Sequence, residues 1–246
     1  MQAIENPGKP TLGATMIQYW SQGELPNDVA FVLSNWQELL EREGLGTVSM
    51  FDRKSAEAWI ASHSPEFCEL FSQAYHYAME SDIFRIAFAS REPCIYMDVD
   101  GWPIRNTARI LRFALESKSS MLYFRANQPW IVNGFFVSWP DCPFFQELVR
   151  QALAVELANL PKNHKTIEDS FGPARYNKVL VDMLAMQDGA VVSSVENLPG
   201  CSELALGNAR VFFSHEAAVA NVRPPFILGY KLTDDYWKKL GPVRSR

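Results

Sequence analysis

The stretch CIYMDVDGWPI, residues 94–104, joins a short apolar run to two aspartates that stand one residue apart. A Gly and a Pro follow directly, and both residue types tend to end a strand. Side chains alternate between the two faces of a strand, so Tyr96, Asp98 and Asp100 are predicted to share one face. The two carboxylates would then lie roughly 7 Å apart at their Cα atoms, from a rise of about 3.3 Å per residue. The stretch predicts a strand that ends in a pair of carboxylates.

The rest of the chain alternates between strand and helix periodicity. Helix 65–91 is expected to be interrupted near Ser81 and Asp82, where a new helix cap is plausible. This alternation predicts an α/β sheet with helices on both faces, in a single domain spanning 1–246. Strand patterns cover 14–20, 47–51, 94–100, 121–124, 131–138, 190–195, 210–215 and 226–232, and helical patterns cover 26–43, 54–61, 65–91, 105–116, 143–160, 166–186 and 233–240.

Composition and charge exclude several classes of partner. The 246 residues carry 23 basic and 28 acidic side chains, a net charge of -5, without a basic block in the body of the chain. Nucleic acid is therefore not an expected partner, because binding it requires clustered Lys and Arg. No segment approaches the roughly 20 apolar residues of a membrane span, so we expect a cytoplasmic protein. Only the tail WKKLGPVRSR, 237–246, offers a mildly basic patch for peripheral membrane contact.

Two carboxylates at the end of a strand suit a hard divalent cation, Mg²⁺ or Mn²⁺, better than zinc. Open α/β sheets bind their ligands at such strand ends. The pair alone is a weak signal, and a solvated strand end is the other interpretation. Upstream, Asp82 and Arg85 would share a helix face. They form either a surface ion pair worth well under 1 kcal/mol or a carboxylate and a guanidinium group that contact a ribose.

Four segments, in order, resemble one family. AMESDIFRIAFASREPCIYMDVDGWPI, 78–104, is similar to the segment "A-x-x-SD-x-x-R…GGIYLD-x-D" of the glycosyltransferases with a DXD sugar-binding region, a group that includes yeast-type α-mannosyltransferases, capsule-synthesis enzymes and the glucosyltransferase domains of large clostridial cytotoxins. Segments 16–40, 131–149 and 171–180 also resemble that family, whereas the last sixty or so residues match poorly. Ordered matches over much of the chain are more specific than one motif.

The resemblance implies a GT-A-like fold, with a nucleotide-sugar-binding half over about 1–140 and an acceptor-side half over about 141–246. It implies a metal-dependent, retaining hexosyltransferase that moves a sugar from a UDP- or GDP-linked donor to a hydroxyl of a glycan or polysaccharide. Mn²⁺, or Mg²⁺ in its place, would be the cofactor. By position, Trp20 would border the base, Asp82 and Arg85 would hold the ribose region, Tyr96 and Asn133 would line the donor site, and Asp98 and Asp100 would be the catalytic and metal-binding pair.

The chain also departs from the family. Pro93 and Cys94 replace a Gly-Gly pair, and CPF at 142–144 replaces "HPF". His215 is a candidate third metal ligand, although the Trp expected soon after it is missing; a structural histidine is the alternative.

Two other functions remain open. The DxDG pattern also resembles the first motif of aspartate-nucleophile phosphatases of the haloacid dehalogenase type, in which Asp98 would attack phosphorus and Asp100 would act as acid and base. Alternatively, the chain binds a nucleotide-sugar without transferring the sugar. For a transferase we expect front-face substitution, because no second carboxylate stands out as a covalent nucleophile.

Overall fold

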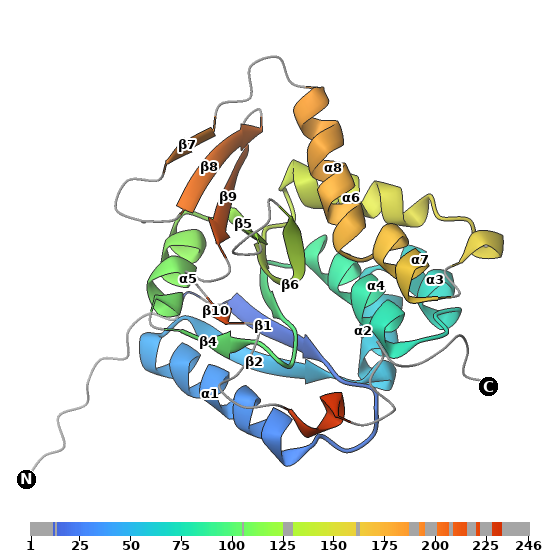
Figure 1. Ribbon diagram of the computed structural model, residues 1–246, viewed down its shortest axis with the longest axis horizontal. Helices are drawn as coiled ribbons and strands as arrows, with labels where there is room; N and C mark the ends of the chain where they lie inside the picture. Colours follow the sequence, from blue (N-terminus) through green and yellow to red (C-terminus); the bar gives the residue numbers. More distant parts are fainter. Residues whose placement is uncertain are drawn as a thin grey trace, which may run out of the picture.

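A mixed eight-stranded sheet forms the centre of the molecule (Figure 1). The computed structural model describes residues 12, 14–104, 106–124, 130–160, 163–186, 192–194, 201–206, 209–215, 220–221 and 228–232. The strand order is β2-β1-β3-β6-β5-β9-β8-β7. The strands are β1 (Ala14–Tyr19), β2 (Gly46–Phe51), β3 (Cys94–Met97), β5 (Ser120–Phe124), β6 (Ile131–Ser138), β7 (Val192–Ser194), β8 (Cys201–Leu206) and β9 (Ala209–His215); β4 (Trp102–Pro103) and β10 (Ala220–Asn221) form a separate pair.

The direction of the strands changes beside β3. β1 pairs in parallel with both β2 and β3, whereas β6 runs antiparallel to both β3 and β5. β9 is parallel to β5, and β7 and β8 complete an antiparallel edge. The carboxyl end of β3 therefore lies beside the first residues of β6.

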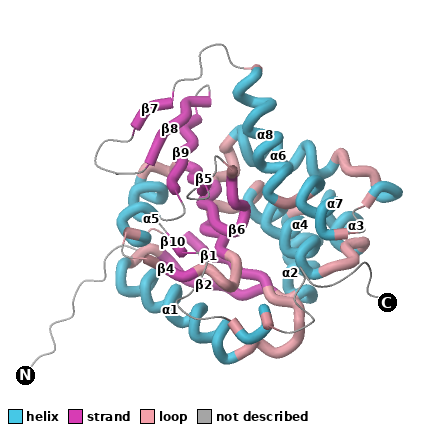
Figure 2. The backbone as a smooth tube through the Cα atoms, viewed as in Figure 1, coloured by secondary structure: helices cyan, strands magenta, loops and turns pink. Residues whose placement is uncertain are grey.

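Helices cover both faces of the sheet (Figures 1 and 2). α1 and α5 pack on one face, and α2, α4, α6 and α8 pack on the other. The helices are α1 (Asn27–Glu43), α2 (Arg53–His63), α3 (Cys68–Ser72), α4 (Tyr77–Ala89), α5 (Thr107–Glu116), α6 (Pro143–Leu153), α7 (His164–Ser170) and α8 (Pro173–Ala185), with short 3₁₀ turns η1 (Pro65–Phe67), η2 (Leu157–Asn159) and η3 (Gly229–Lys231).

Each face of the sheet has its own buried core. In β3, Ile95 and Met97 belong to the core beneath α1 and α5, whereas Cys94 and Tyr96 belong to the core beneath α4 and α6. The alternation predicted for this strand is therefore confirmed through Met97. Burial on both faces explains why β3 reads as a nearly continuous apolar run.

Local sequence features set the first elements. In α1, Val29, Val32, Trp36 and Leu40 are buried, so apolar residues three or four positions apart form one stripe. Gly44 ends that helix in the left-handed region at φ 64°, which glycine adopts at low cost. Among the described residues, no helix is both long enough and apolar enough to cross a membrane.

Several predicted elements differ in the structure. Helix 65–91 is broken at 73–76, not at 81–82, and His76 caps α4 by accepting a hydrogen bond from the Ala78 N–H. Helix 143–160 ends at Leu153, and 166–186 is divided where Pro173 starts α8, because proline suits a first helical turn and not an interior.

At the C-terminal end, residues 229–231 form a 3₁₀ turn where a strand was predicted, and strand β8 was missed. The predicted helix 233–240 and the ends of strand 190–195 lie outside the described residues. The division of the chain into a donor half and an acceptor half stays a prediction.

Candidate functional site

The two aspartates lie in a turn that follows β3. The Asp98 N–H still donates to the Gly134 carbonyl of β6, at 2.7 Å, but the Gly101 N–H donates to the Asp98 carbonyl, at 2.9 Å. The prediction that one extended strand runs through Asp100 is therefore wrong. The Trp36 indole N–H donates to the Gly101 carbonyl, at 2.6 Å, and ties the turn to α1.

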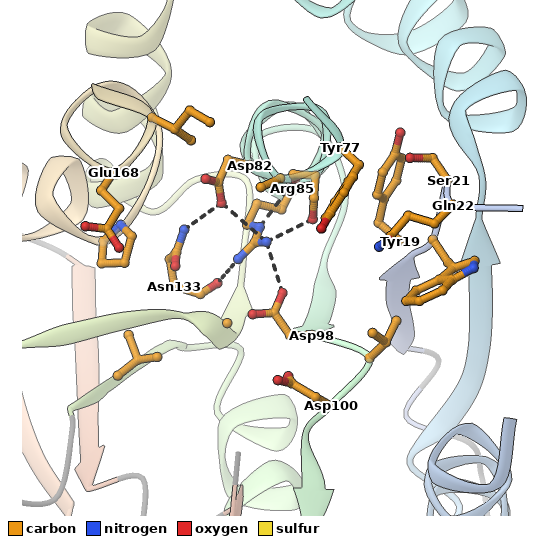
Figure 3. A pocket seen from close by; sticks show the side chains of 18 of the residues that line it. Tyr19, Ser21, Gln22, Tyr77, Asp82, Arg85, Asp98, Asp100, Asn133 and Glu168 are labelled. Carbon is orange, nitrogen blue, oxygen red and sulfur yellow. Dashed lines mark hydrogen bonds and ion pairs between the residues drawn. The ribbon is translucent and has the colours of Figure 1, made fainter. Parts of the chain in front are cut away.

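This turn forms one wall of a cleft of about 290 Å³ (Figure 3), a volume at the lower end of the range for small-molecule sites. β1, α4, β6, α7, α8 and η3 supply the other walls. The cleft brings together most of the residues that the sequence singled out. Its lining comprises Tyr19, Trp20, Ser21, Gln22, Tyr77, Ala78, Ser81, Asp82, Arg85, Asp98, Val99, Asp100, Val132, Asn133, Gly134, Ile167, Glu168, Pro173, Tyr230 and Lys231.

Arg85 holds the polar side chains of the cleft in place (Figure 3). One guanidinium nitrogen, Nη2, lies 3.0 Å from Asp98 Oδ1 and 3.3 Å from Asp82 Oδ1, and donates to Ser81 Oγ at 2.9 Å. The other, Nη1, donates to the Asn133 carbonyl at 2.6 Å. The side chains of Asp82 and Arg85 are only 10% and 5% exposed, so the interpretation as a surface ion pair is wrong. The expected contact between Arg85 and a nucleotide stays a prediction.

Tyr96 lies beneath the cleft and does not line it, which corrects the sequence prediction. The residue is only 1% exposed, because Phe136 stacks on its ring, with centroids 5.3 Å apart, and the Arg85 guanidinium lies 4.1 Å from the ring centroid. The Tyr96 hydroxyl donates to Asp98 Oδ1 at 2.8 Å and is 2.9 Å from Ser81 Oγ. Tyr96 therefore positions the Asp98 carboxylate.

Asp82 is a buried carboxylate in the interior of α4. Asn133 Nδ2 donates to its Oδ1 at 2.9 Å, so Asn133 faces the cleft as predicted but is directed at a protein partner. Burial raises the pKa of Asp82 to about 6, Arg85 lowers it, and the neighbouring Asp98 raises it. Removing charge from water is costly, which explains the direction of the shift.

Asp100 faces a cation that the sequence analysis did not identify. Lys231 of η3 forms an ion pair with Asp100 Oδ2. Burial raises the pKa of Asp100, and Asp98 adds to the effect, whereas Lys231 lowers it. The two carboxylates therefore share one cleft, but each has a separate cationic partner.

Aromatic residues form another wall of the cleft. Trp20 is 7% exposed, and its ring meets that of Tyr230 edge to face with centroids 5.2 Å apart. Beside it, Tyr19 and Ser21 donate to the buried Glu80, at 2.7 and 2.9 Å. This network fixes the chain at the end of β1, where Trp20 was predicted to border a base. That contact with a base stays a prediction.

His215 is the last residue of β9, where its backbone is in register with Phe124 of β5. Phe124 in turn pairs with Ile131 at the start of β6, so His215 lies on the same edge of the sheet as Asp98. Among the described residues, no group of three or more His, Cys, Asp or Glu is arranged to hold a metal. The role of His215 as a third ligand stays a prediction.

Charge in the cleft is predominantly negative. Among its described lining residues, Asp82, Asp98, Asp100 and Glu168 are acidic, and Arg85 and Lys231 are basic, which gives a formal charge of -2. Such a cleft attracts cations, and it repels an anionic ligand unless that ligand brings a cation.

Several cleft residues were not predicted. Ser81 was taken for a helix cap, Glu168 lies on a helix without a recognisable motif, and Lys231 lies in a segment that reads as a strand. Only the spacing of Ser81 and Arg85, four residues apart on one helix face, could have indicated that they interact.

Comparisons with known proteins bear on the fold. No protein-family model matches the chain, and no curated protein matches it. Among solved structures, the chain is similar to the PaToxG glycosyltransferase, with a TM-score of 0.50 and 14% sequence identity over 74% of this chain and 72% of that chain. The expected α/β, GT-A-like fold, a sheet flanked by helices, is thereby confirmed. At this identity the likeness establishes the fold alone.

Proposed function

We propose that this protein is a metal-dependent glycosyltransferase that uses a nucleotide-sugar donor. The observation that carries the proposal is the pair Asp98 and Asp100, which line one cleft at the carboxyl end of β3 beside Trp20. Ligands of open α/β sheets bind outside the carboxyl ends of the strands. The fold and this placement together favour a nucleotide-sugar over a simple phosphate.

The donor set of the cleft fits a hard divalent cation. Asp98 Oδ1 accepts hydrogen bonds from Arg85 and Tyr96, while Oδ2 has no hydrogen-bond donor among the described residues and lies beside Gly134, where a Cβ would be 2.4 Å away. Mg²⁺ and Mn²⁺ are bound by one or two carboxylates together with substrate phosphates. Asp98 and Asp100 would hold the ion, with no third protein ligand required.

The charge of the cleft supports metal dependence. A nucleoside diphosphate is an anion, and the described lining already carries a formal charge of -2. Arg85 is already counted in this sum, and its guanidinium nitrogens interact with Asp98, Asp82, Ser81 and the Asn133 carbonyl. A divalent cation would act as a Lewis acid that stabilises the negative charge on the departing diphosphate.

The residues of the chain would then orient the donor and exclude water. Trp20 and the end of β1 would border the base, and Asp82 with Asn133 would lie beside the ribose or the sugar. Glu168, Ile167 and Pro173 form the side of the cleft that α7 and α8 supply, which we assign to the acceptor. We favour retention through front-face substitution, in which the leaving phosphate takes the proton of the acceptor hydroxyl.

Binding of nucleotides tests the proposal directly. We expect UDP or GDP, with Mn²⁺, to raise the melting temperature of the wild-type protein, because a ligand at 100 times its Kd adds about 2.7 kcal/mol of stability. Asp100→Asn should abolish this shift and sugar transfer while leaving the fold intact. Asp141→Asn, at an exposed position outside the cleft lining, is the matched control. Full transfer activity in Asp100→Asn would refute the proposal.

The same preparation distinguishes the two other functions. Hydrolysis of a simple phosphate monoester without a nucleotide-sugar would favour the phosphatase. Against it, Arg85 and Tyr96 both donate to Asp98 Oδ1, and an oxygen engaged in two hydrogen bonds is a poorer nucleophile. Donor binding with neither transfer nor slow donor hydrolysis would favour a binding protein.

A further inference from the structure

The segment Leu228–Leu232, which we call the strap, borders the cleft from the C-terminal part of the chain. Leu228 is buried in the core beneath α1. The Gly229 N–H donates to Asp28 Oδ2 at 2.5 Å, and Tyr230 packs edge to face on Trp20. Three consecutive residues are thus fixed to other elements, and the position of Lys231 is set by them.

The strap places the Lys231 ammonium group against Asp100. The side chains of Lys231 and Asp100 are 21% and 23% exposed, so the ion pair is largely shielded from water. Lysine is a compact point charge with three donors and no fixed fork. It can therefore pair with one carboxylate oxygen without a fixed geometry, and can leave it by rotation of its flexible side chain.

A metal ion at Asp100 would meet this ammonium group. Both are cations that would share one carboxylate, and their repulsion is strong where water is partly excluded. Arg85 cannot relieve this repulsion by exchanging partners, because its guanidinium group already forms ion pairs with Asp98 and Asp82 and a hydrogen bond with Ser81. The Lys231 ammonium group and a metal ion would therefore exclude each other at Asp100.

We infer that Lys231 is an internal counter-ion that competes with the divalent cation for Asp100, so that the metal binds only when the ammonium group leaves. This inference rests on the proposed function, because it takes Asp98 and Asp100 as the metal ligands. It assigns Lys231 a role in the metal-free protein: the ammonium group neutralises Asp100 and disfavours binding of free metal.

The competing explanation is that Lys231 only anchors the strap. Lys231→Met removes the charge and keeps most of the length of the side chain, whereas Lys231→Arg keeps the charge. Lys178→Met is the matched control, because Lys178 is 58% exposed and pairs with Asp182 on α8, outside the cleft lining. An anchor alone would change stability in Lys231→Met without strengthening metal binding.

The test is the affinity of the full chain for Mn²⁺ alone, followed by the electron paramagnetic resonance signal of free Mn²⁺ at constant ionic strength. We expect Lys231→Met to bind Mn²⁺ at least about tenfold more tightly than the wild type, and Lys231→Arg and Lys178→Met to match the wild type. Adding Asp100→Asn to Lys231→Met should abolish the gain. Affinity in Lys231→Met that is equal to or weaker than that of the wild type overturns the inference, as does a gain that survives Asp100→Asn.

Failure of this inference is distinguishable from failure of the proposed function. If Lys231→Met gains no Mn²⁺ affinity but a nucleoside diphosphate with Mn²⁺ still stabilises the wild type, only the competition is refuted. If no nucleotide stabilises the wild type with metal, the proposed function fails as well.

Discussion

Asp82→Asn is expected to remove a pH dependence from the stability of the protein. Asp82 is buried in α4, and its Oδ1 accepts a hydrogen bond from Asn133 and lies 3.3 Å from Arg85. An asparagine can keep that oxygen in place, so the substitution removes the titration while preserving these contacts. The folded state binds the Asp82 proton more tightly than the unfolded chain does, because burial raises its pKa.

The magnitude follows from the two pKa values. The pKa is about 6 in the folded protein against an ordinary value of 3.8, and each tenfold change in proton affinity corresponds to about 1.4 kcal/mol. At a pH above both pKa values, the unfolding free energy of the wild type is therefore about 3 kcal/mol lower than at a pH below both of them. Most of this loss develops as the pH rises from about 4 to about 7, and Asp82→Asn should not show it.

Urea unfolding at pH 4 to 7 measures this effect as a difference between two proteins. The unfolding free energy of Asp82→Asn minus that of the wild type should increase by about 2 kcal/mol from pH 4 to pH 7, because part of the effect of about 3 kcal/mol lies below pH 4. Asp141→Asn, in an exposed turn before α6, serves as the control and should give a constant difference. A constant difference for Asp82→Asn, or one that decreases with pH, would refute the reasoning.

Three further substitutions test the positioning of the two carboxylates. Gly134→Ala places a Cβ 2.4 Å from Asp98 Oδ2. Because the end of a carboxylate side chain can rotate away, we expect a stability loss of only about 1 kcal/mol. Mn²⁺-dependent nucleotide affinity, measured by calorimetry, should nevertheless drop about tenfold or more, and an unchanged affinity would contradict this. Arg85→Lys should lower the unfolding free energy by about 2 to 4 kcal/mol in urea, since one ammonium group cannot serve every partner of the guanidinium; a loss below about 0.5 kcal/mol would show that the network is not needed. Trp36→Phe leaves the Gly101 carbonyl without its donor and should cost about 1 to 3 kcal/mol, with a proportional fall in melting temperature; an unchanged melting temperature would argue against the tie between α1 and the turn.

The fold could be predicted well where one periodicity extends over a buried surface. The predicted strand 131–138 coincides with β6, and the predicted helix 26–43 differs from α1 by one residue. Prediction was weaker where a single residue decides the boundary. Pro173 divides a long helical pattern, and His76, an uncommon cap, starts α4.

The site could be predicted in part. Sequence alternation brought Asp98 to the correct face of β3, but the turn closed by Gly101 sets the direction of Asp100. Lys231 was not predicted because its role depends on a contact with Asp100 over 131 positions of sequence, and one sequence carries no signal of that pairing. Likewise, Tyr96 was expected to contact a ligand, since alternation gives the face of a side chain but not its depth.

The wide separation in sequence of the paired side chains has a consequence for folding. Arg85 meets the Asn133 carbonyl across 48 positions, Asn133 meets Asp82 across 51, and Lys231 meets Asp100 across 131. Such non-local contacts form only after large loops have closed, and proteins dominated by them fold slowly. Asp100 would therefore lack Lys231 in early, incomplete states of the chain, and the network of Arg85, Asp82 and Asn133 would be incomplete without β6. We expect metal-dependent nucleotide binding to return among the last events when the unfolded protein is refolded.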